Sequence, residues 1–156
     1  MKKEIVLISA CLLGEKCRYD GKDNLVAELK KLTKYFDLIP VCPEVSGGLK
    51  IPRKPSEIRE DKVVSIDNKD VSEKFYDGAY WAYVIAKKYS IKLAILKESS
   101  PSCGTHTIYD GTFSNKKIQG MGITAKKLQD NGVKVISEKE ALILLKELER
   151  QDGKEI

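Results

Sequence analysis

Three of the four cysteines in this sequence follow short apolar runs. The runs cover residues 5–8, 38–41 and 93–96, and they lead into the loops that hold Cys11, Cys42 and Cys103. Short apolar runs that stop at Ser, Pro or Gly are typical of buried strands followed by tight turns. In an open parallel sheet, ligands bind in the crevice outside the carboxyl ends of the strands. We therefore expect the three thiols to meet at one crevice, where they indicate a metal or redox centre.

The spacing of the cysteines excludes a local zinc motif. Successive cysteines are six, twenty-five and sixty-one residues apart, so none forms the C-x-x-C pair of a zinc knuckle or a thioredoxin-like dithiol. Thiolates that converge from distant positions are soft ligands, which favours an iron–sulfur cluster or zinc over magnesium or calcium. The alternative is that the cysteines are inert, buried small hydrophobes. Against it, a cysteine that fills a core belongs inside a strand rather than just beyond its end.

Carboxylate and hydroxyl side chains accompany these cysteine loops. Glu44 lies two residues after the second of the three cysteines, and Glu98 comes just before the Ser-Pro-Ser-Cys loop, so either is a candidate general base. A solvated or helix-capping carboxylate is the alternative for both. Ser100 and Ser102, with their neighbour Ser99, are suited to bind a ligand or to satisfy the backbone of the turn.

Arg53 and His106 are the remaining candidates. The Arg53 guanidinium is suited to an anion or a planar base, although a surface position is the default for an arginine. His106 is the only histidine in the sequence, which excludes a metal site with two histidines, and we expect a structural role for it.

Alternating strand and helix patterns must position these side chains. Strand patterns cover residues 4–10, 37–41, 92–96 and 133–136. Helix patterns begin after Asp23 or Asn24, at Val71, at Gly120 and after Ser137. Pro40 lacks a backbone donor, so we expect it near an edge of the sheet or at the end of its strand. The irregular segment 45–70 is expected to form a hairpin arm over the site, and residues 107–113 a small hairpin.

This alternation predicts an α/β fold. We expect an open, mostly parallel, Rossmann-like β-sheet of about four core strands with helices on both faces, in one domain over residues 1–156. With 42% apolar and 33% charged residues, the apolar runs are far too short to cross a bilayer. The first residues carry no signal-peptide core, so we expect a cytoplasmic protein with free thiols. The net charge of +5 is spread along the chain, which indicates a lysine-rich solvated surface rather than a nucleic-acid site.

Several short motifs stand in a specific order along the chain. They are Ser9-Ala10-Cys11-Leu12-Leu13-Gly14, Cys17-Arg18-Tyr19-Asp20-Gly21, Val41-Cys42-Pro43-Glu44-Val45, Gly47-Gly48-Leu49, Pro52-Arg53 and Ser100-Pro101-Ser102-Cys103-Gly104. In this order and spacing, from the first strand to the segment Gly120-x-Gly122-x-Thr124-Ala125, the chain resembles the thiouracil desulfidase family. The resemblance implies the same α/β fold with Rossmann-like topology.

The resemblance implies a 4Fe-4S cluster held by Cys11, Cys42 and Cys103, with one iron left without a protein ligand. These are the three cysteines that the strand pattern selects independently. Cys17 is expected not to be a ligand. The alternative is that it serves as a fourth ligand in a closed, electron-transfer type of site.

The implied reaction removes sulfur from a thiolated pyrimidine such as 2-thiouracil and gives uracil and sulfide. As a hypothesis, the open iron binds the leaving sulfur as a Lewis acid, and a water activated by Glu44 attacks the ring carbon. Ser100 or Ser102 would hold the ring or the developing oxyanion, and Arg53 would close over the substrate.

Some relatives carry an additional domain and act on thiolated uridine in transfer RNA. This chain has no such extension, so we expect a small thiolated nucleobase or nucleoside as substrate, rather than tRNA, and no membrane partner. Two alternatives stay open. One is a zinc- or cluster-binding sensor or structural module without turnover, and the other is a nucleotide-binding Rossmann-like protein with incidental cysteines.

Overall fold

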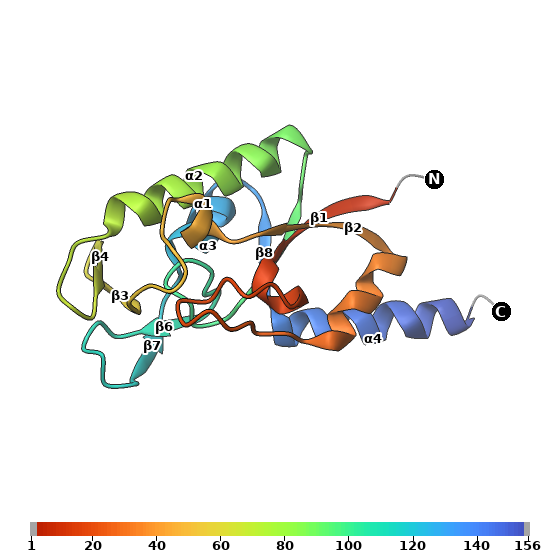
Figure 1. Cartoon of the computed structure of the whole chain (residues 1–156). Coiled ribbons are helices and arrows are strands. Elements are labelled where there is room, and N and C mark those ends of the chain that lie inside the picture. Colours follow the sequence, from red (N-terminus) through yellow and green to blue (C-terminus); the bar gives the residue numbers. More distant parts are fainter. Residues whose placement is uncertain (1–2, 155–156) are drawn as a thin grey trace.

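A four-stranded parallel β-sheet forms the centre of the structure, a computed structural model that describes residues 3–154 (Figure 1). Its strands, in spatial order, are β2 (Phe36–Val41), β1 (Glu4–Ser9), β5 (Leu93–Leu96) and β8 (Lys134–Ser137). They closely match the predicted strands, because unbroken apolar runs are suited to strands covered on both faces. β2 is an edge strand, one of the two positions expected for Pro40, and Pro40 pairs there with Ile8.

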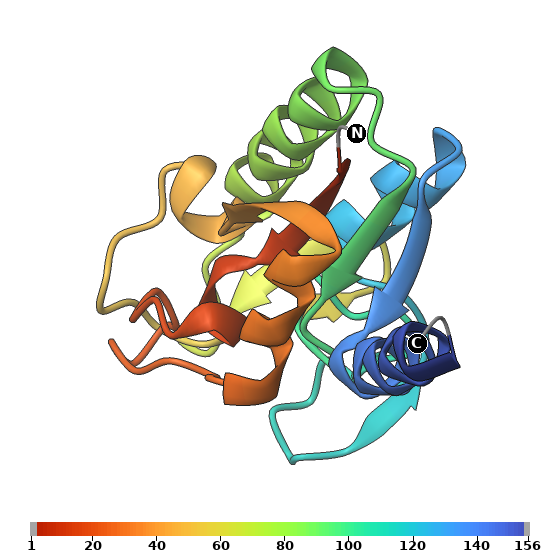
Figure 2. The same cartoon turned by 90° about the vertical axis from the view of Figure 1, so that its right-hand side faces the viewer.

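Helices cover both faces of this sheet (Figure 2). Those on one face are α2 (Ser72–Lys88) and α3 (Ile123–Asp130), and those on the other are the 3-10 helix η2 (Ala27–Lys34) and α4 (Glu138–Lys154). Successive strand residues point to opposite faces. Leu7 therefore packs with side chains of α2 and α3, whereas Val6 and Ile8 pack with those of η2 and α4. The predicted α/β class with helices on both faces is confirmed.

The helix η2, which comes first of these four along the chain, starts later than predicted. η2 begins at Ala27, because the backbone N–H groups of Asn24 and Val26 donate to carbonyls of the loop after β1, at 3.0 and 2.9 Å. These bonds hold the segment before η2 against that loop. Leu25, which lies in this segment, is 46% exposed as a result.

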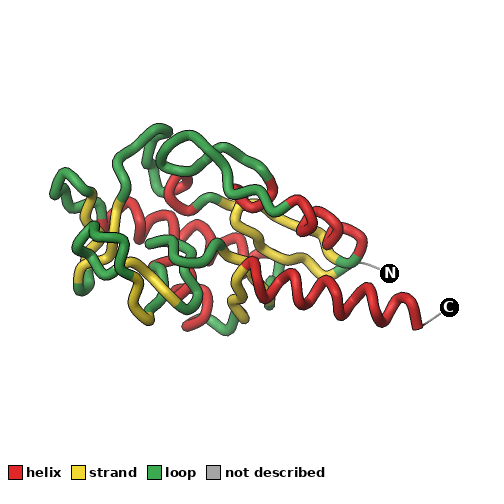
Figure 3. The backbone as a smooth tube through the Cα atoms, turned by 90° about the horizontal axis from the view of Figure 1, so that it is seen from below, coloured by secondary structure: helices red, strands yellow, loops and turns green. Residues whose placement is uncertain are grey.

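Two antiparallel hairpins lie at one end of the molecule, opposite to the start of β1 and the end of α4 (Figures 1 and 3). They pair β3 (Ser56–Arg59) with β4 (Lys62–Ser65) and β6 (Thr107–Tyr109) with β7 (Lys117–Gln119). The β3–β4 hairpin is the arm predicted within residues 45–70.

The second hairpin is wider than the small hairpin predicted over residues 107–113, because its second strand, β7, begins only at Lys117. The Glu57 carboxylate of β3 accepts the backbone N–H groups of Gly111 and Phe113 at 3.0 and 3.2 Å. Arg59 donates to the Gly111 carbonyl at 2.8 Å. These bonds hold residues 111–113 against β3, so the strand that pairs with β6 begins only at β7. They also connect the β6–β7 hairpin to the β3–β4 hairpin.

The remaining helices include one that the sequence did not predict, α1 (Pro43–Ser46), directly after β2. At α4 the predicted cap is confirmed, since the Glu140 carboxylate accepts the Ser137 N–H and the Ser137 hydroxyl accepts the Glu140 N–H. Within residues 3–154, no helix is long and apolar enough to cross a membrane. One domain over residues 1–156 stays a prediction, because residues 1–2 and 155–156 lie outside the described part.

Candidate active site

A cavity of about 500 Å³ opens where the carboxyl ends of β1, β2 and β5 face the two hairpins. One wall is formed by the loops that directly follow these strands, and residues of both hairpins, Glu57 and Tyr109 among them, form another. The predicted site residues that line it are Cys11, Cys42, Cys103, Glu44, Arg53, Ser100 and Ser102. The crevice expected from the strand pattern is therefore present and brings together segments that are far apart in the sequence.

Three thiols reach this cavity from neighbouring strands. Cys11 lies in the short 3-10 helix η1 (Ala10–Leu13) that follows β1, and Cys42 is the first residue after β2. Cys103 lies in the loop after β5 and is 4% exposed. Cys17 also lines the cavity, and all four cysteines are free thiols. The thiols predicted to converge thus share one cavity wall with the fourth cysteine.

Cys17 lies close enough to Cys11 and Cys42 to change the acidity of both. Interaction with the Cys17 thiol lowers the pKa of Cys42 to about 7, although burial opposes this change. The same interaction lowers the pKa of Cys11, with a smaller contribution from Asn24, and it raises the pKa of Cys17 far above its ordinary value. Because thiolates rather than thiols bind metals, these lowered pKa values suit Cys11 and Cys42 to ligation.

Cys103 has a different environment. Burial raises the pKa of its thiol to about 12, and the Ser9 and Ser102 side chains only partly oppose this effect. A metal ion that binds a thiol displaces its proton, so this pKa is compatible with a ligand role.

The donor set fits an iron–sulfur cluster better than a single metal ion. Among residues 3–154, no group of three or more His, Cys, Asp or Glu side chains is placed to hold one ion. A zinc ion needs its ligands about 2.0–2.3 Å from one point, whereas a four-iron cluster spans more space and takes thiolate ligands. His106 bonds Glu140 at 2.7 Å and is not part of the cavity wall. The wall therefore offers thiols without histidine, a donor set that suits an iron–sulfur cluster.

Glu44 and Ser102 form the centre of a hydrogen-bond chain on the cavity wall. α1 begins at Pro43 and places Glu44 in its first turn. The Ser102 hydroxyl donates to Glu44 Oε2 at 2.9 Å, and the hydroxyl oxygens of Ser100 and Ser102 are 2.9 Å apart. Glu44 Oε2 at 2.9 Å is a nearer and stronger acceptor for the one Ser102 proton than Cys103 Sγ at 3.6 Å, so the Ser100 hydroxyl is the donor to Ser102. A path for a proton therefore connects Ser100 with Glu44.

Ser100 also shapes the loop around Cys103. Its hydroxyl oxygen accepts the backbone N–H groups of Ser102 and Cys103, both at 3.1 Å. With one bond donated and two accepted, this hydroxyl has no lone pair left for another partner. Its predicted contact with substrate stays a prediction and requires that one of these bonds be given up.

Arg53 is bound to protein groups through all three guanidinium nitrogens. Nε donates to Glu44 Oε1 at 3.2 Å, Nη1 to the Lys50 carbonyl at 3.2 Å, and Nη2 to the Cys17 carbonyl at 2.8 Å. The Arg53 and Glu44 side chains are only 8% and 16% exposed. Arg53 therefore orients Glu44 and joins it to the loop that holds Cys17, while its predicted contact with substrate stays a prediction.

Glu98 lines the same cavity, but its carboxylate accepts five hydrogen bonds from its own loop. Oε2 accepts the Thr105 hydroxyl at 2.7 Å. Oε1 accepts backbone N–H groups, at 2.8–3.1 Å, from Ser99, Thr105, His106 and Thr107. Burial acts to raise the pKa of Glu98, but these hydrogen bonds outweigh it and lower the pKa to about 2. Such an acidic carboxylate is a poor base near neutral pH, so Glu44 is the better candidate of the two.

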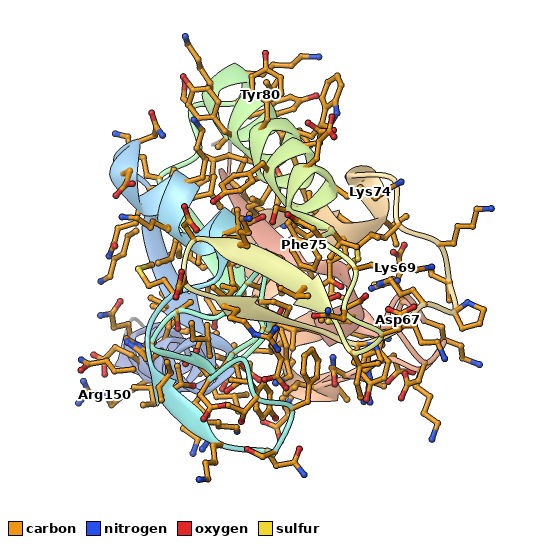
Figure 4. All side chains as sticks on the ribbon, turned by 90° about the vertical axis from the view of Figure 1, so that its left-hand side faces the viewer. Asp67, Lys69, Lys74, Phe75, Tyr80 and Arg150 are labelled. Atoms are coloured by element: carbon orange, nitrogen blue, oxygen red, sulfur yellow. The ribbon has the colours of Figure 1, made fainter. Side chains whose placement is uncertain are left out.

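Two glycines allow α1 to approach α2 closely enough to hold Glu44 in place. A Cβ atom on Gly47 would lie 1.9 Å from the Lys74 carbonyl oxygen, and one on Gly78 would lie 1.9 Å from the Pro43 carbonyl oxygen. The Lys74 side chain donates to a carbonyl just after α1 at 3.2 Å and stands at the surface, whereas Phe75 is buried beneath α2 (Figure 4). Only residues without a Cβ fit at this contact.

Asn24 and Lys97 are among the residues of the cavity wall that were not selected from the sequence. Asn24 Nδ2 donates to Cys11 Sγ at 3.4 Å. Lys97 pairs with Glu138 at 3.1 Å. The position of Lys97 directly after an apolar run is a usable signal, because it marks the carboxyl end of a strand. Nothing in the sequence marks Asn24, whose contact depends on how its loop folds back.

Comparisons with known proteins place the chain in a family. Residues 6–140 match the model of the family described as 2-thiouracil desulfurase. The uncharacterized protein YbbK of Bacillus subtilis (strain 168) is 42% identical over 146 residues, a match that covers 87% of this chain and 97% of that protein. The solved structure of the 4Fe-4S-dependent thiouracil desulfidase TudS matches with a TM-score of 0.85 and 38% identity, over 92% of this chain and 99% of that chain. The chain therefore belongs to the 2-thiouracil desulfurase family, as its motifs predicted.

Proposed function

We propose that this protein is a 4Fe-4S-dependent desulfidase that removes sulfur from a thiolated pyrimidine such as 2-thiouracil. The family match and the likeness to TudS support a cluster-dependent desulfidase. The observation that carries the finer proposal is one cavity whose wall combines free thiols with the bonded pair of Glu44 and Ser102.

Cys11, Cys42 and Cys103 would hold the cluster, because they reach the cavity from three neighbouring strands. A cluster with three protein ligands supplies an iron site that is open to a sulfur atom and acts on it as a Lewis acid. Cys17 lines the same cavity but lies further along the connection between η1 and η2, so it would be a neighbour of the cluster rather than a ligand.

Glu44 is the base in this proposal. Each of its oxygens accepts one hydrogen bond, from Arg53 and from Ser102, so each keeps a lone pair for a water in the cavity. The carboxylate takes a proton as this water attacks the ring carbon that carries sulfur. The carbon–oxygen bond forms, the carbon–sulfur bond breaks, and sulfur leaves as hydrosulfide. One water is consumed for each uracil and sulfide formed.

The cavity suits a free nucleobase or nucleoside. Its volume of about 500 Å³ lies in the range of small-molecule sites, about 300–1,000 Å³. The aromatic side chains of Tyr19, Tyr109 and Phe113 line it and are suited to pack against a planar base. We therefore propose a small substrate rather than tRNA.

Anaerobic purification tests the cofactor assignment. We expect brown protein with iron and acid-labile sulfide in equal amounts, and loss of colour in Cys11→Ser, Cys42→Ser and Cys103→Ser. Cys17→Ser is the matched control, since it removes a thiol from the same wall and is expected to keep the cluster. Colourless protein with stoichiometric zinc would overturn the proposal in favour of a structural or sensor module.

Sulfide release from 2-thiouracil tests the base. Glu44→Gln keeps the length of the side chain but cannot take a proton, so we expect kcat to fall about 10²- to 10⁴-fold with cluster content unchanged. Glu140→Gln is the control, because Glu140 bonds His106 outside the cavity. Undiminished release by cluster-loaded Glu44→Gln would remove Glu44 from the mechanism.

A further inference from the structure

Asn24 is bonded to Cys11 at two points, although thirteen residues separate them in the chain. Its side-chain Nδ2 lies 3.4 Å from Cys11 Sγ, and its backbone N–H donates to the Cys11 carbonyl at 3.0 Å. Sulfur has a larger radius than oxygen, so an N···S distance of 3.4 Å corresponds to a formed hydrogen bond. The backbone bond holds the residue in register with Cys11, and the side-chain bond reaches the sulfur itself.

The orientation of the Asn24 amide is determined by its other neighbour. Arg18 Nη1 lies 3.2 Å from Asn24 Oδ1, and a guanidinium can only donate. The amide oxygen must therefore face Arg18, which leaves the NH₂ group facing the Cys11 sulfur. Arg18 is held in turn by Asp20, at 2.8 Å, and by the Asp23 carbonyl, at 3.3 Å. A chain of oriented groups thus runs from Asp20 through Arg18 and Asn24 to Cys11.

We infer that Asn24 is a positioning residue whose N–H···S hydrogen bond orients the Cys11 thiolate and withdraws electron density from it. The inference rests on the proposed function, in which Cys11 is a cluster ligand. Hydrogen bonds to ligand sulfurs help to set the reduction potential of an iron–sulfur cluster, because they stabilise the more negative, reduced state. Partners that orient metal ligands also contribute to retention of the metal. Asn24 therefore raises the reduction potential and slows the loss of the cluster.

The variants Asn24→Asp and Asn24→Ala separate these effects in the anaerobically purified, cluster-loaded protein. Asp keeps the shape of the side chain and its bond to Arg18 but places a carboxylate oxygen against the sulfur, whereas Ala removes both contacts. We expect a lower reduction potential in both variants, with the larger shift in Asn24→Asp. A redox titration monitored by EPR measures the potential. We also expect loss of the cluster to an iron chelator to become about 10-fold faster or more.

Two further variants complete the series. Arg18→Met frees the Asn24 amide to rotate. The reduction potential of the cluster in this variant should therefore lie between those of the wild type and Asn24→Ala. Asn131→Asp is the matched control and should change neither readout, because Asn131 is an exposed residue whose amide bonds the Lys127 carbonyl.

The outcomes distinguish this inference from the proposed function. Wild-type protein that carries no cluster at all would refute the proposed function. A cluster whose potential and lifetime are unchanged in both Asn24 variants would overturn the inference alone. A lower melting temperature without a shift in potential would also overturn it, since that result is the signature of a merely structural contact.

Discussion

Glu44 and Glu98 line the same cavity, and the number of donors around each carboxylate gives them different roles. Glu98 accepts five hydrogen bonds, which hold the loop after β5 in shape. Glu44 accepts two, from Arg53 and Ser102. The five hydrogen bonds to Glu98 lower its pKa to about 2 and make it a poor base, so Glu98 is suited to hold the loop and Glu44 to take a proton.

Arg53→Lys tests whether Arg53 acts through Glu44 or on the substrate directly. Lysine keeps the charge but lacks the planar fork that reaches Glu44 Oε1 and the Cys17 carbonyl together. We expect kcat to fall about 10- to 100-fold with little change in KM, because Glu44 loses its orientation. Steady-state kinetics of the cluster-loaded enzyme measure both values. A raised KM at constant kcat would instead assign Arg53 to substrate binding.

Glu98→Gln is expected to destabilise the protein at neutral pH and to do so less in acid. The folded-state pKa of about 2 lies below the ordinary value of 4.5, so the ionised carboxylate stabilises the fold above about pH 4.5. This contribution is lost as the pH falls toward about 2. One pKa unit corresponds to about 1.4 kcal/mol. Solvent screening at this partly exposed site reduces the contribution of the ionised carboxylate to the free energy of unfolding to about 1–2 kcal/mol.

Urea unfolding of the wild type and Glu98→Gln at about pH 7 and about pH 3 checks this expectation. The difference in the free energy of unfolding should narrow in acid. A difference that stays constant between the two pH values would show that the carboxylate charge is not the stabilising feature.

At the scale of elements, the α1–α2 contact determines where the chemistry sits. α1 carries Glu44 immediately after Cys42, and it rests on α2 through Gly47 and Gly78. Because each glycine meets backbone atoms of the other helix, neither helix can move without the other. The position of Glu44 relative to the thiols therefore depends on the close packing of α1 on α2 at Gly47 and Gly78.

Gly78→Ala tests this dependence. Alanine favours a helix over glycine by about 1 kcal/mol, but here its Cβ would lie 1.9 Å from the Pro43 carbonyl oxygen and 2.7 Å from the carbonyl carbon. Backbone atoms cannot rotate away, so we expect a net loss of about 1–3 kcal/mol in the free energy of unfolding and slower sulfide release. Urea unfolding and steady-state kinetics measure the two effects.

Gly153→Ala is the matched control, because Gly153 lies in α4 and an added Cβ meets no atom within 4 Å. Its stability should be unchanged or slightly raised. Equal losses in the two variants would mean that the α1–α2 contact has no special role.

The elements that the sequence predicted well are those defined by their own periodicity. The core strands and α2 follow from apolar runs and helical spacing, and the α4 cap follows from Ser137 and Glu140. The late start of η2 and the wide β6–β7 hairpin arise from hydrogen bonds to distant segments, which no local pattern reveals. The same distinction applies to the residues of the site. The end of a strand predicts the position of Cys11, whereas the contact between Asn24 and Cys11 depends on a loop that folds back.

At the scale of the whole molecule, the parallel register explains how distant cysteines come to share one wall. Ser9 at the end of β1 pairs with Val41 at the end of β2, and Ile8 pairs with Ile95 of β5. The three strands therefore end nearly level, and the residues that follow them emerge side by side. A group bound to Cys11, Cys42 and Cys103 would join these three segments directly, in addition to the sheet and to the bond between Ser102 and Glu44.

Removal of the cluster is therefore expected to lower the melting temperature. A group that binds only the folded chain stabilises it, and a site built from separate segments does not exist in the unfolded chain. For a chain of this size, about 3 kcal/mol of stabilisation corresponds to a shift of roughly 6–12 °C. Circular dichroism melting under anaerobic conditions, before and after chelation of the iron, measures it. Chelator should not change the melting temperature of Cys11→Ser, and equal melting temperatures for the loaded and stripped wild type would show that the cluster does not link the three strands.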